Sequence, residues 1–130
     1  MTKVSGEFSV NMAPQASEPD SPALGRMVLD KQYHGALQAR GAGQMLTTHG
    51  AVAGSAVYVA LETVTGSLDG REGSFSLVHH GLLVRGRPTL SIAVVPDSGT
   101  GALAGLVGHM NIRVDGHKHF YDFEFTLPDA

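Results

Sequence analysis

Residues 55–84, SAVYVALETVTGSLDGREGSFSLVHHGLLV, contain two runs of alternating apolar and polar residues on either side of an Asp-Gly pair at residues 69–70. An Asp-Gly pair between two such runs is a strong signal for a β-hairpin. If the loop is Gly-Arg, Glu62 lies opposite His79. If the loop is Asp-Gly, His79 lies opposite Ala60, and Glu62 is its diagonal neighbour on the same face. Both registers remain open, and both bring a carboxylate and an imidazole within reach of each other.

The rest of the chain also alternates, and no window keeps a helical apolar stripe for three turns. We therefore expect β-strands throughout. The proline-rich residues 13–25 are expected to form a loop or a lid at one end of the fold, because proline cannot donate to a strand ladder. Besides the two runs of the hairpin, the predicted strands are Lys3–Asn11, Gly25–His34, Leu37–Thr47, Thr89–Val95, Gly108–Val114 and residues 119–127.

A second Asp-Gly pair, at residues 115–116, predicts another hairpin near the end of the chain. With that pair as the loop, Met110 lies opposite Tyr121, and Ile112 lies opposite His119. The strand after this turn has the most regular period-two face of the sequence, formed by His119, Tyr121, Phe123, Phe125 and Leu127.

Seven or eight consecutive antiparallel strands with short turns and no crossover helices predict one domain over residues 1–130. The expected architecture is all-β, a closed eight-stranded up-and-down barrel, because closure removes exposed strand edges. A barrel of eight strands has room for one small ligand in a central cavity. An open β-sandwich is the alternative.

Composition excludes several classes of function. The 130 residues carry nine Lys and Arg against twelve Asp and Glu, a net charge of −3, without a basic cluster, so we expect no nucleic-acid partner. The absence of cysteine excludes disulfides, thiolate catalysis and cysteine-based zinc sites. The sequence shows neither a signal-peptide core nor an apolar run long enough to span a membrane, so we expect a cytoplasmic protein without a membrane partner.

The inward face of the central hairpin holds the main candidate site. Glu62 is the one carboxylate on an otherwise apolar strip, and an isolated buried carboxylate must find a partner or take up a proton. His79 is the partner within reach. The pair is either a tuned acid–base pair in a ligand pocket or a structural pair that fixes strand register. The other expected pocket residues are Tyr58, Phe75, Leu77, Met110, His119, Tyr121 and Phe123.

The sequence predicts neither a metal nor a cofactor. His117 and His119 share a strand face, and together with His79 they are candidate ligands for a metal ion. However, His117 lies at the turn, and no third ligand has convincing spacing. The glycine-rich residues 98–101 lack the strand-to-helix context and the lysine of a phosphate loop. Phenolic hydroxyls that can donate into the cavity are those of Tyr33, Tyr58 and Tyr121.

Two segments carry a resemblance to a known family: GSLDGREGSFSLVHHG at residues 66–81 and VVPDSGTGALAG at residues 94–105. Together with residues 25–31, 43–46 and 119–128, they resemble small bacterial proteins of unknown function in the allene oxide cyclase-like barrel superfamily. The resemblance implies an eight-stranded, calycin-like barrel with a central cavity. The plant cyclases that name the superfamily act on an unstable epoxide without a cofactor, mainly by shaping an apolar cavity.

Two functions from different classes follow from these features. The first is a cofactor-independent isomerase, cyclase or lyase that acts on a small, largely apolar molecule, with Glu62 as the polarising acid or base and His79 orienting it. The second is a non-catalytic, lipocalin-like protein that holds a small apolar or amphipathic molecule in the barrel.

Apolar residues on the outward strand faces suggest self-association. Val78 and Leu82 share the outward face of one strand, and Phe120 lies outward on another. Because a contiguous apolar patch marks a partner surface, we expect a homo-oligomer, a dimer or trimer that packs barrel walls together.

Overall fold

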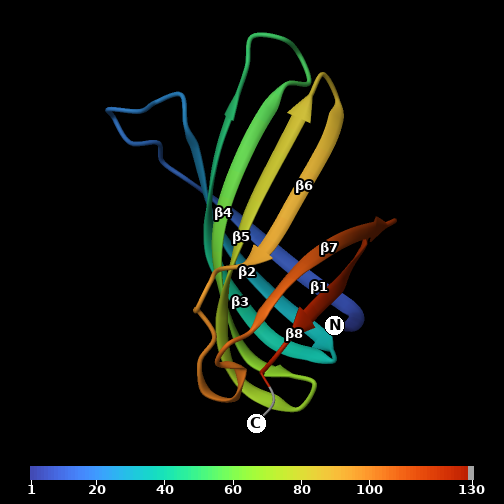
Figure 1. The fold of residues 1–130 in the computed structure, drawn as a ribbon. Helices are drawn as coiled ribbons and strands as arrows, with labels where there is room; N and C mark the ends of the chain where they lie inside the picture. The colour runs from blue at the N-terminus through green and yellow to red at the C-terminus, as the bar shows by residue number, and fades with distance from the viewer. Residues whose placement is uncertain (129–130) are drawn as a thin grey trace.

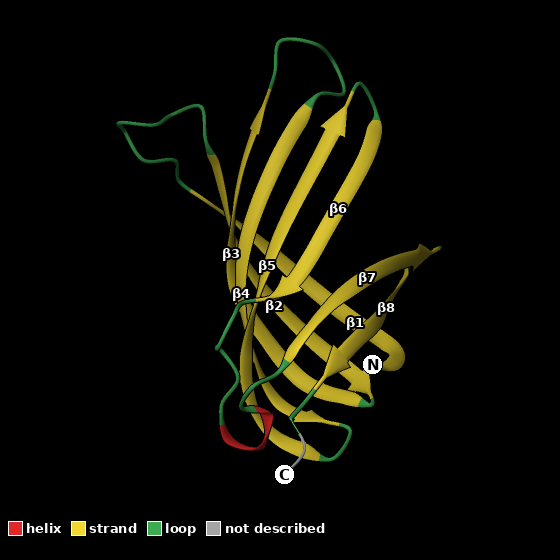
Figure 2. Ribbon diagram, in the orientation of Figure 1, coloured by secondary structure: helices red, strands yellow, loops and turns green. Residues whose placement is uncertain are grey.

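A computed structural model describes residues 1–128 as one antiparallel barrel in which sequence neighbours pair and β1 closes onto β8 (Figure 1). Within these residues the only helix is a short 3₁₀ turn at Gly101–Leu103 (Figure 2). The predicted all-β class and the closed eight-stranded barrel are therefore confirmed. The strands are β1 (Thr2–Gln15), β2 (Gly25–Gly35), β3 (Leu37–His49), β4 (Ala56–Leu68), β5 (Arg71–Val84), β6 (Arg87–Val94), β7 (Val107–Asp115) and β8 (Lys118–Thr126).

The hairpin of β4 and β5 uses Asp69-Gly70 as its two loop residues. Both have positive φ, 51° and 81°, as a tight hairpin turn requires if it is to match the twist of the strands. His79 consequently pairs with Ala60. Glu62 is its diagonal neighbour on the inner face, which is the second of the two registers that the sequence allowed.

The predicted register of the β7–β8 hairpin is wrong by two residues. Met110 pairs with Phe123 rather than with Tyr121, and Ile112 pairs with Tyr121 rather than with His119. The loop is residues 116–117, with the glycine at positive φ, so the turn lies one residue further along the chain. Because side chains alternate with a period of two, the shift leaves every residue on its predicted face.

The strands β1 and β3 run further than predicted. β1 continues to Gln15 and pairs with β2 over its last residues, so the loop that follows is residues 16–24. β8 pairs only with Thr2–Phe8 of β1, so the edge of β1 that faces β8 has no partner strand at Pro14. Proline is tolerated at such an edge because no backbone N–H is needed there for a strand hydrogen bond.

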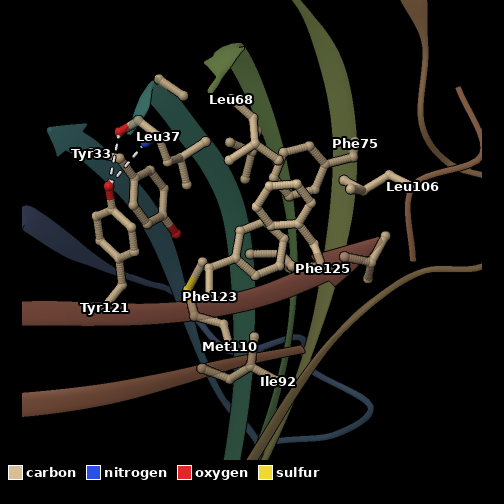
Figure 3. Close-up of a cluster of buried hydrophobic side chains, with 14 of the residues drawn as sticks. Tyr33, Leu37, Leu68, Phe75, Ile92, Leu106, Met110, Tyr121, Phe123 and Phe125 are labelled. Carbon is tan, nitrogen blue, oxygen red and sulfur yellow. Dashed lines mark hydrogen bonds between the residues drawn. The ribbon is translucent and has the colours of Figure 1, made fainter. Parts of the chain in front are cut away.

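One end of the barrel is filled by aromatic and aliphatic side chains. Phe75 and Phe123 stack with ring centroids 5.8 Å apart, and Phe125 lies 5.3 Å from Phe123 (Figure 3). Leu103 and Leu106, from the segment between β6 and β7, pack into the same cluster. This end of the barrel is therefore a solid core.

The seam between β6 and β7 is much shorter than the others. The two strands pair only at Ile92–Met110 and Ala93–His109. Beyond these pairs, residues 87–91 of β6 and residues 111–115 of β7 diverge (Figure 1). The barrel is thus closed and packed at one end and spread apart at the other.

Tyr121 ties β8 to the β2–β3 turn. Its buried hydroxyl accepts a hydrogen bond from the backbone N–H of Leu37 at 3.0 Å and donates to the carbonyl oxygen of His34 at 2.8 Å. Gly6 leaves room for this contact, because a Cβ there would lie 2.5 Å from the hydroxyl.

We predict that Tyr121→Phe lowers the free energy of unfolding by about 1–3 kcal/mol, because it leaves a buried N–H without its acceptor. Urea unfolding followed by circular dichroism measures the loss. Tyr58→Phe is the control, since the Tyr58 hydroxyl makes no described hydrogen bond and the ring is only half-buried. Equal losses in the two variants would contradict a structural role of the Tyr121 hydroxyl.

Candidate functional site

A buried carboxylate forms the centre of the candidate site. Glu62 on β4 is 1% exposed, and its Oε1 accepts hydrogen bonds from Lys31 Nζ at 3.1 Å and from His79 Nε2 at 2.9 Å. Its Oε2 accepts a short hydrogen bond, 2.5 Å, from the hydroxyl of Tyr33. We call these four residues the Glu62 network. Both carboxylate oxygens are satisfied by donors from β2 and β5.

A glycine on the intervening strand makes the network possible. Gly41 of β3 pairs with Lys31 on one side and with Val64 on the other. A Cβ at this position would collide with Glu62 Oε2 and would lie 3.1 Å from the ring of Tyr33. The absence of a side chain therefore lets Glu62 reach across β3 to the donors on β2.

The neighbouring donors keep Glu62 ionised. Burial raises the pKa of this carboxyl, but the hydrogen bond from His79, the charge of Lys31 and the hydrogen bond from Tyr33 lower it, and the net pKa lies below the ordinary value. Burial and the adjacent carboxylate raise the pKa of Tyr33 far above its usual range. Tyr33 therefore stays protonated and acts as a hydrogen-bond donor.

Lys31 is a buried cation, 6% exposed, beside two aromatic rings that also contact each other. Its Nζ lies 5.3 Å from the centroid of the Phe8 ring and 5.8 Å from that of the Tyr33 ring. Cation–π contacts of this length add to the ion pair with Glu62. The ammonium is thus held by one carboxylate and two ring faces.

A cavity of about 320 Å³ lies above the network, inside the spread end of the barrel. Leu90 and Ile112 line it from the diverging parts of β6 and β7. Lys31 and His79 line it, whereas Glu62 does not, so these two side chains stand between the carboxylate and the cavity. The full lining is Phe8, Val10, Met12, Leu29, Lys31, Met45, Tyr58, Ala60, His79, Leu90, Ile112 and His119. We call this space the barrel cavity.

The residues predicted for the pocket divide between the cavity and the core. Tyr58, His79 and His119 line the barrel cavity, and the predicted contact between Glu62 and His79 is present. The remaining predicted pocket residues belong to the packed core and do not line the cavity: Phe75, Leu77, Met110, Tyr121 and Phe123.

Lys31 belongs to the site but was not predicted from the sequence. Leu29, Lys31 and Tyr33 share the inner face of β2, so a lysine between two buried apolar positions was the available signal. The Tyr33 hydroxyl, expected to donate into the cavity, donates to Glu62 instead.

No metal centre is evident. Among residues 1–128, no group of three or more histidine, cysteine or acidic side chains is placed to hold a metal ion. His117 is exposed at the β7–β8 turn, whereas His119 packs against Phe8 with ring centroids 5.3 Å apart. In the same part of the chain, no helix has the length and apolar character needed to cross a membrane.

Fold and site together define a small β-barrel with an ion network beneath an apolar cavity. The chain belongs to the family described as protein of unknown function DUF3224, whose model matches residues 4–125. It is similar to a crystal structure of a protein with unknown function from this family from Shewanella oneidensis MR-1. The two share 47% sequence identity and a TM-score of 0.92 over 100% of this chain and 99% of that chain. A search of curated proteins found no match.

We predict that Glu62→Gln lowers the free energy of unfolding by about 3 kcal/mol, because it leaves the Lys31 ammonium buried without a counter-charge. The double variant Lys31→Met/Glu62→Gln should recover much of this loss, since it removes both charges together. A double-mutant cycle in urea measures the coupling.

Asp30→Asn is the matched control for this cycle. Asp30 on β2 forms an ion pair with Arg40 on β3, but both side chains are exposed, at 52% and 68%. Exposed pairs contribute about 0–1 kcal/mol. If Glu62→Gln costs no more than Asp30→Asn, the carboxylate is not held as a buried charge.

Proposed function

We propose that this protein binds one small, largely apolar molecule in the barrel cavity. The observation that carries the proposal is an apolar space of about 320 Å³ with a few convergent polar groups at one wall. Ligand pockets occupy roughly 300–1,000 Å³ and are lined in this way, so the volume fits a small ligand rather than a large one. The diverging strands β6 and β7 supply an entry route that does not require the packed end to open.

A lipocalin-like protein that binds without reaction is the simpler form of this proposal. This form is supported by the division of the barrel into a packed core and a preformed cavity. Binding in such a cavity requires no catalytic group. The relationship to the allene oxide cyclase-like superfamily is compatible with this form and remains part of the proposal. The proposal also includes cytoplasmic localisation and function without a cofactor, a nucleic-acid partner or a membrane partner.

A cofactor-independent isomerase, cyclase or lyase is the second candidate. It is favoured by the 2.9 Å contact between His79 Nε2 and Glu62 at the cavity wall. An imidazole oriented by a carboxylate is a common arrangement for proton transfer. Because Glu62 does not line the cavity, His79 would be the group that exchanges a proton with the substrate. Glu62 would orient it, which reverses the roles expected from the sequence.

Filling the cavity tests the proposed function. We predict that Ala60→Leu weakens binding of the neutral fluorescent probe N-phenyl-1-naphthylamine about tenfold or more, because Ala60 is buried and lines the cavity. Val59→Leu is the control, since Val59 is the next residue on β4, lies 44% exposed and does not line the cavity.

Thermal melting of both variants shows whether the fold is kept. Unchanged affinity in a folded Ala60→Leu variant, or no saturable binding of the probe to the wild type, would overturn the proposal. Native mass spectrometry of freshly purified protein adds an independent reading, because a retained small molecule appears as a defined mass increment.

We further propose that the outer face of β3–β5 joins copies of this chain. Leu61 is 63% exposed, and it lines, with Leu46, Val59 and Val78, an outer hollow of about 710 Å³. A contiguous apolar patch of this kind marks a partner surface, and a twofold axis would place the patch against itself. Phe120, expected to contribute, is instead half-buried.

We predict that multi-angle light scattering gives a mass of at least two chains, and that Leu61→Glu restores the monomer. Val114→Glu is the control, because Val114 is equally exposed, at 64%, but lies on β7 outside the patch. A mass near 13.6 kDa at every concentration would contradict self-association.

A further inference from the structure

We propose that the molecule in the barrel cavity carries one anionic head group, a carboxylate in the simplest case, and that Lys31 binds it. The inference rests on the proposed function, since it names the chemical class of the ligand for the same cavity. It makes Lys31, which is 6% exposed and lines the cavity wall, the residue that selects the ligand.

The polar groups on the cavity wall are biased toward basic nitrogen. Lys31, His79 and His119 line the cavity, and none of the lining residues is acidic. The nearest carboxylate, Glu62, lies behind Lys31 and His79 and accepts hydrogen bonds from both. A molecule in the cavity therefore contacts Lys31 and His79 and does not contact the Glu62 carboxylate.

Lys31 has hydrogen-bonding capacity that the protein leaves unused. An ammonium group has three donors, and the one described hydrogen bond of Lys31 goes to Glu62 Oε1. The ring faces of Phe8 and Tyr33 stabilise its charge but do not act as conventional acceptors. A carboxylate supplies two oxygens for the remaining donors, and such charge-assisted bonds are about twice as strong as neutral ones.

Lys31 and His79 lie next to each other at the cavity wall, because both contact the same oxygen of Glu62. Lys31 and His79 both contact Glu62 Oε1, at 3.1 Å and 2.9 Å. The centroid of the Phe8 ring lies 5.3 Å from Lys31 Nζ and 5.3 Å from the centroid of the His119 ring. A head group placed at the Lys31 ammonium thus has His79 beside it. The rest of the ligand would lie along the apolar wall formed by Val10, Met12, Leu29, Met45, Leu90 and Ile112.

A matched series of eight-carbon ligands tests the head group. Octanoate, octanamide and octylammonium share one apolar body and differ in being anionic, neutral or cationic. Each is titrated near neutral pH and low ionic strength against protein loaded with N-phenyl-1-naphthylamine, and displacement gives the affinities. We expect octanoate to bind about tenfold more tightly than octanamide, and octylammonium to bind most weakly.

Variants assign the preference to Lys31. In Lys31→Met/Glu62→Gln, which removes both charges, the ratio of the octanoate affinity to the octanamide affinity should fall from about ten to about one. Lys3→Met is the control, because Lys3 is an exposed lysine on β1 outside the cavity, and the preference for octanoate should persist there.

The outcomes separate this inference from the proposed function. If the probe binds but octanamide or octylammonium matches octanoate in the wild type, the anionic head group is wrong and the cavity remains a binding site. If the preference persists in the double variant, Lys31 is not the residue that selects the ligand. If neither the probe nor any of the three ligands binds, the proposed function itself fails.

Discussion

The negative charge of Glu62 inside the barrel is the constraint on which the rest of the site depends. An ionised carboxylate removed from water costs several kcal/mol unless donors replace the lost hydration. Here the donors come from Lys31, Tyr33 and His79, on two strands that do not adjoin each other. The missing side chain at Gly41 and the register of the β4–β5 hairpin are both needed to bring these donors to one carboxylate.

The Glu62 network also marks the boundary between the two halves of the barrel. Tyr33 points toward the packed end, where its ring meets that of Tyr121 edge-on at 5.7 Å. Lys31 and His79 face the cavity at the other end. Because side chains locked by packing and hydrogen bonds hold their geometry, the core beneath the network keeps the polar wall of the cavity in a fixed arrangement.

The sequence predicted the contact between Glu62 and His79 because it follows from period-two alternation and a recognisable turn. Either loop placement left both side chains on the same inner face. The β7–β8 register was not predictable in this way, since a shift of two residues preserves every face and the hydrophobic pattern does not change. Lys31 was missed for another reason: its contact with Glu62 crosses a third strand, and it depends on the room that Gly41 provides.

The ion pair gives Lys31 a counter-charge at the wall of an apolar cavity. Without Glu62, the Lys31 ammonium would be buried with only ring faces to stabilise it. Replacing a buried ion pair with well-packed apolar residues is often neutral or stabilising, so a barrel that needed only to fold would gain little from this pair. Its place at the cavity wall is the observation behind the binding role proposed for Lys31.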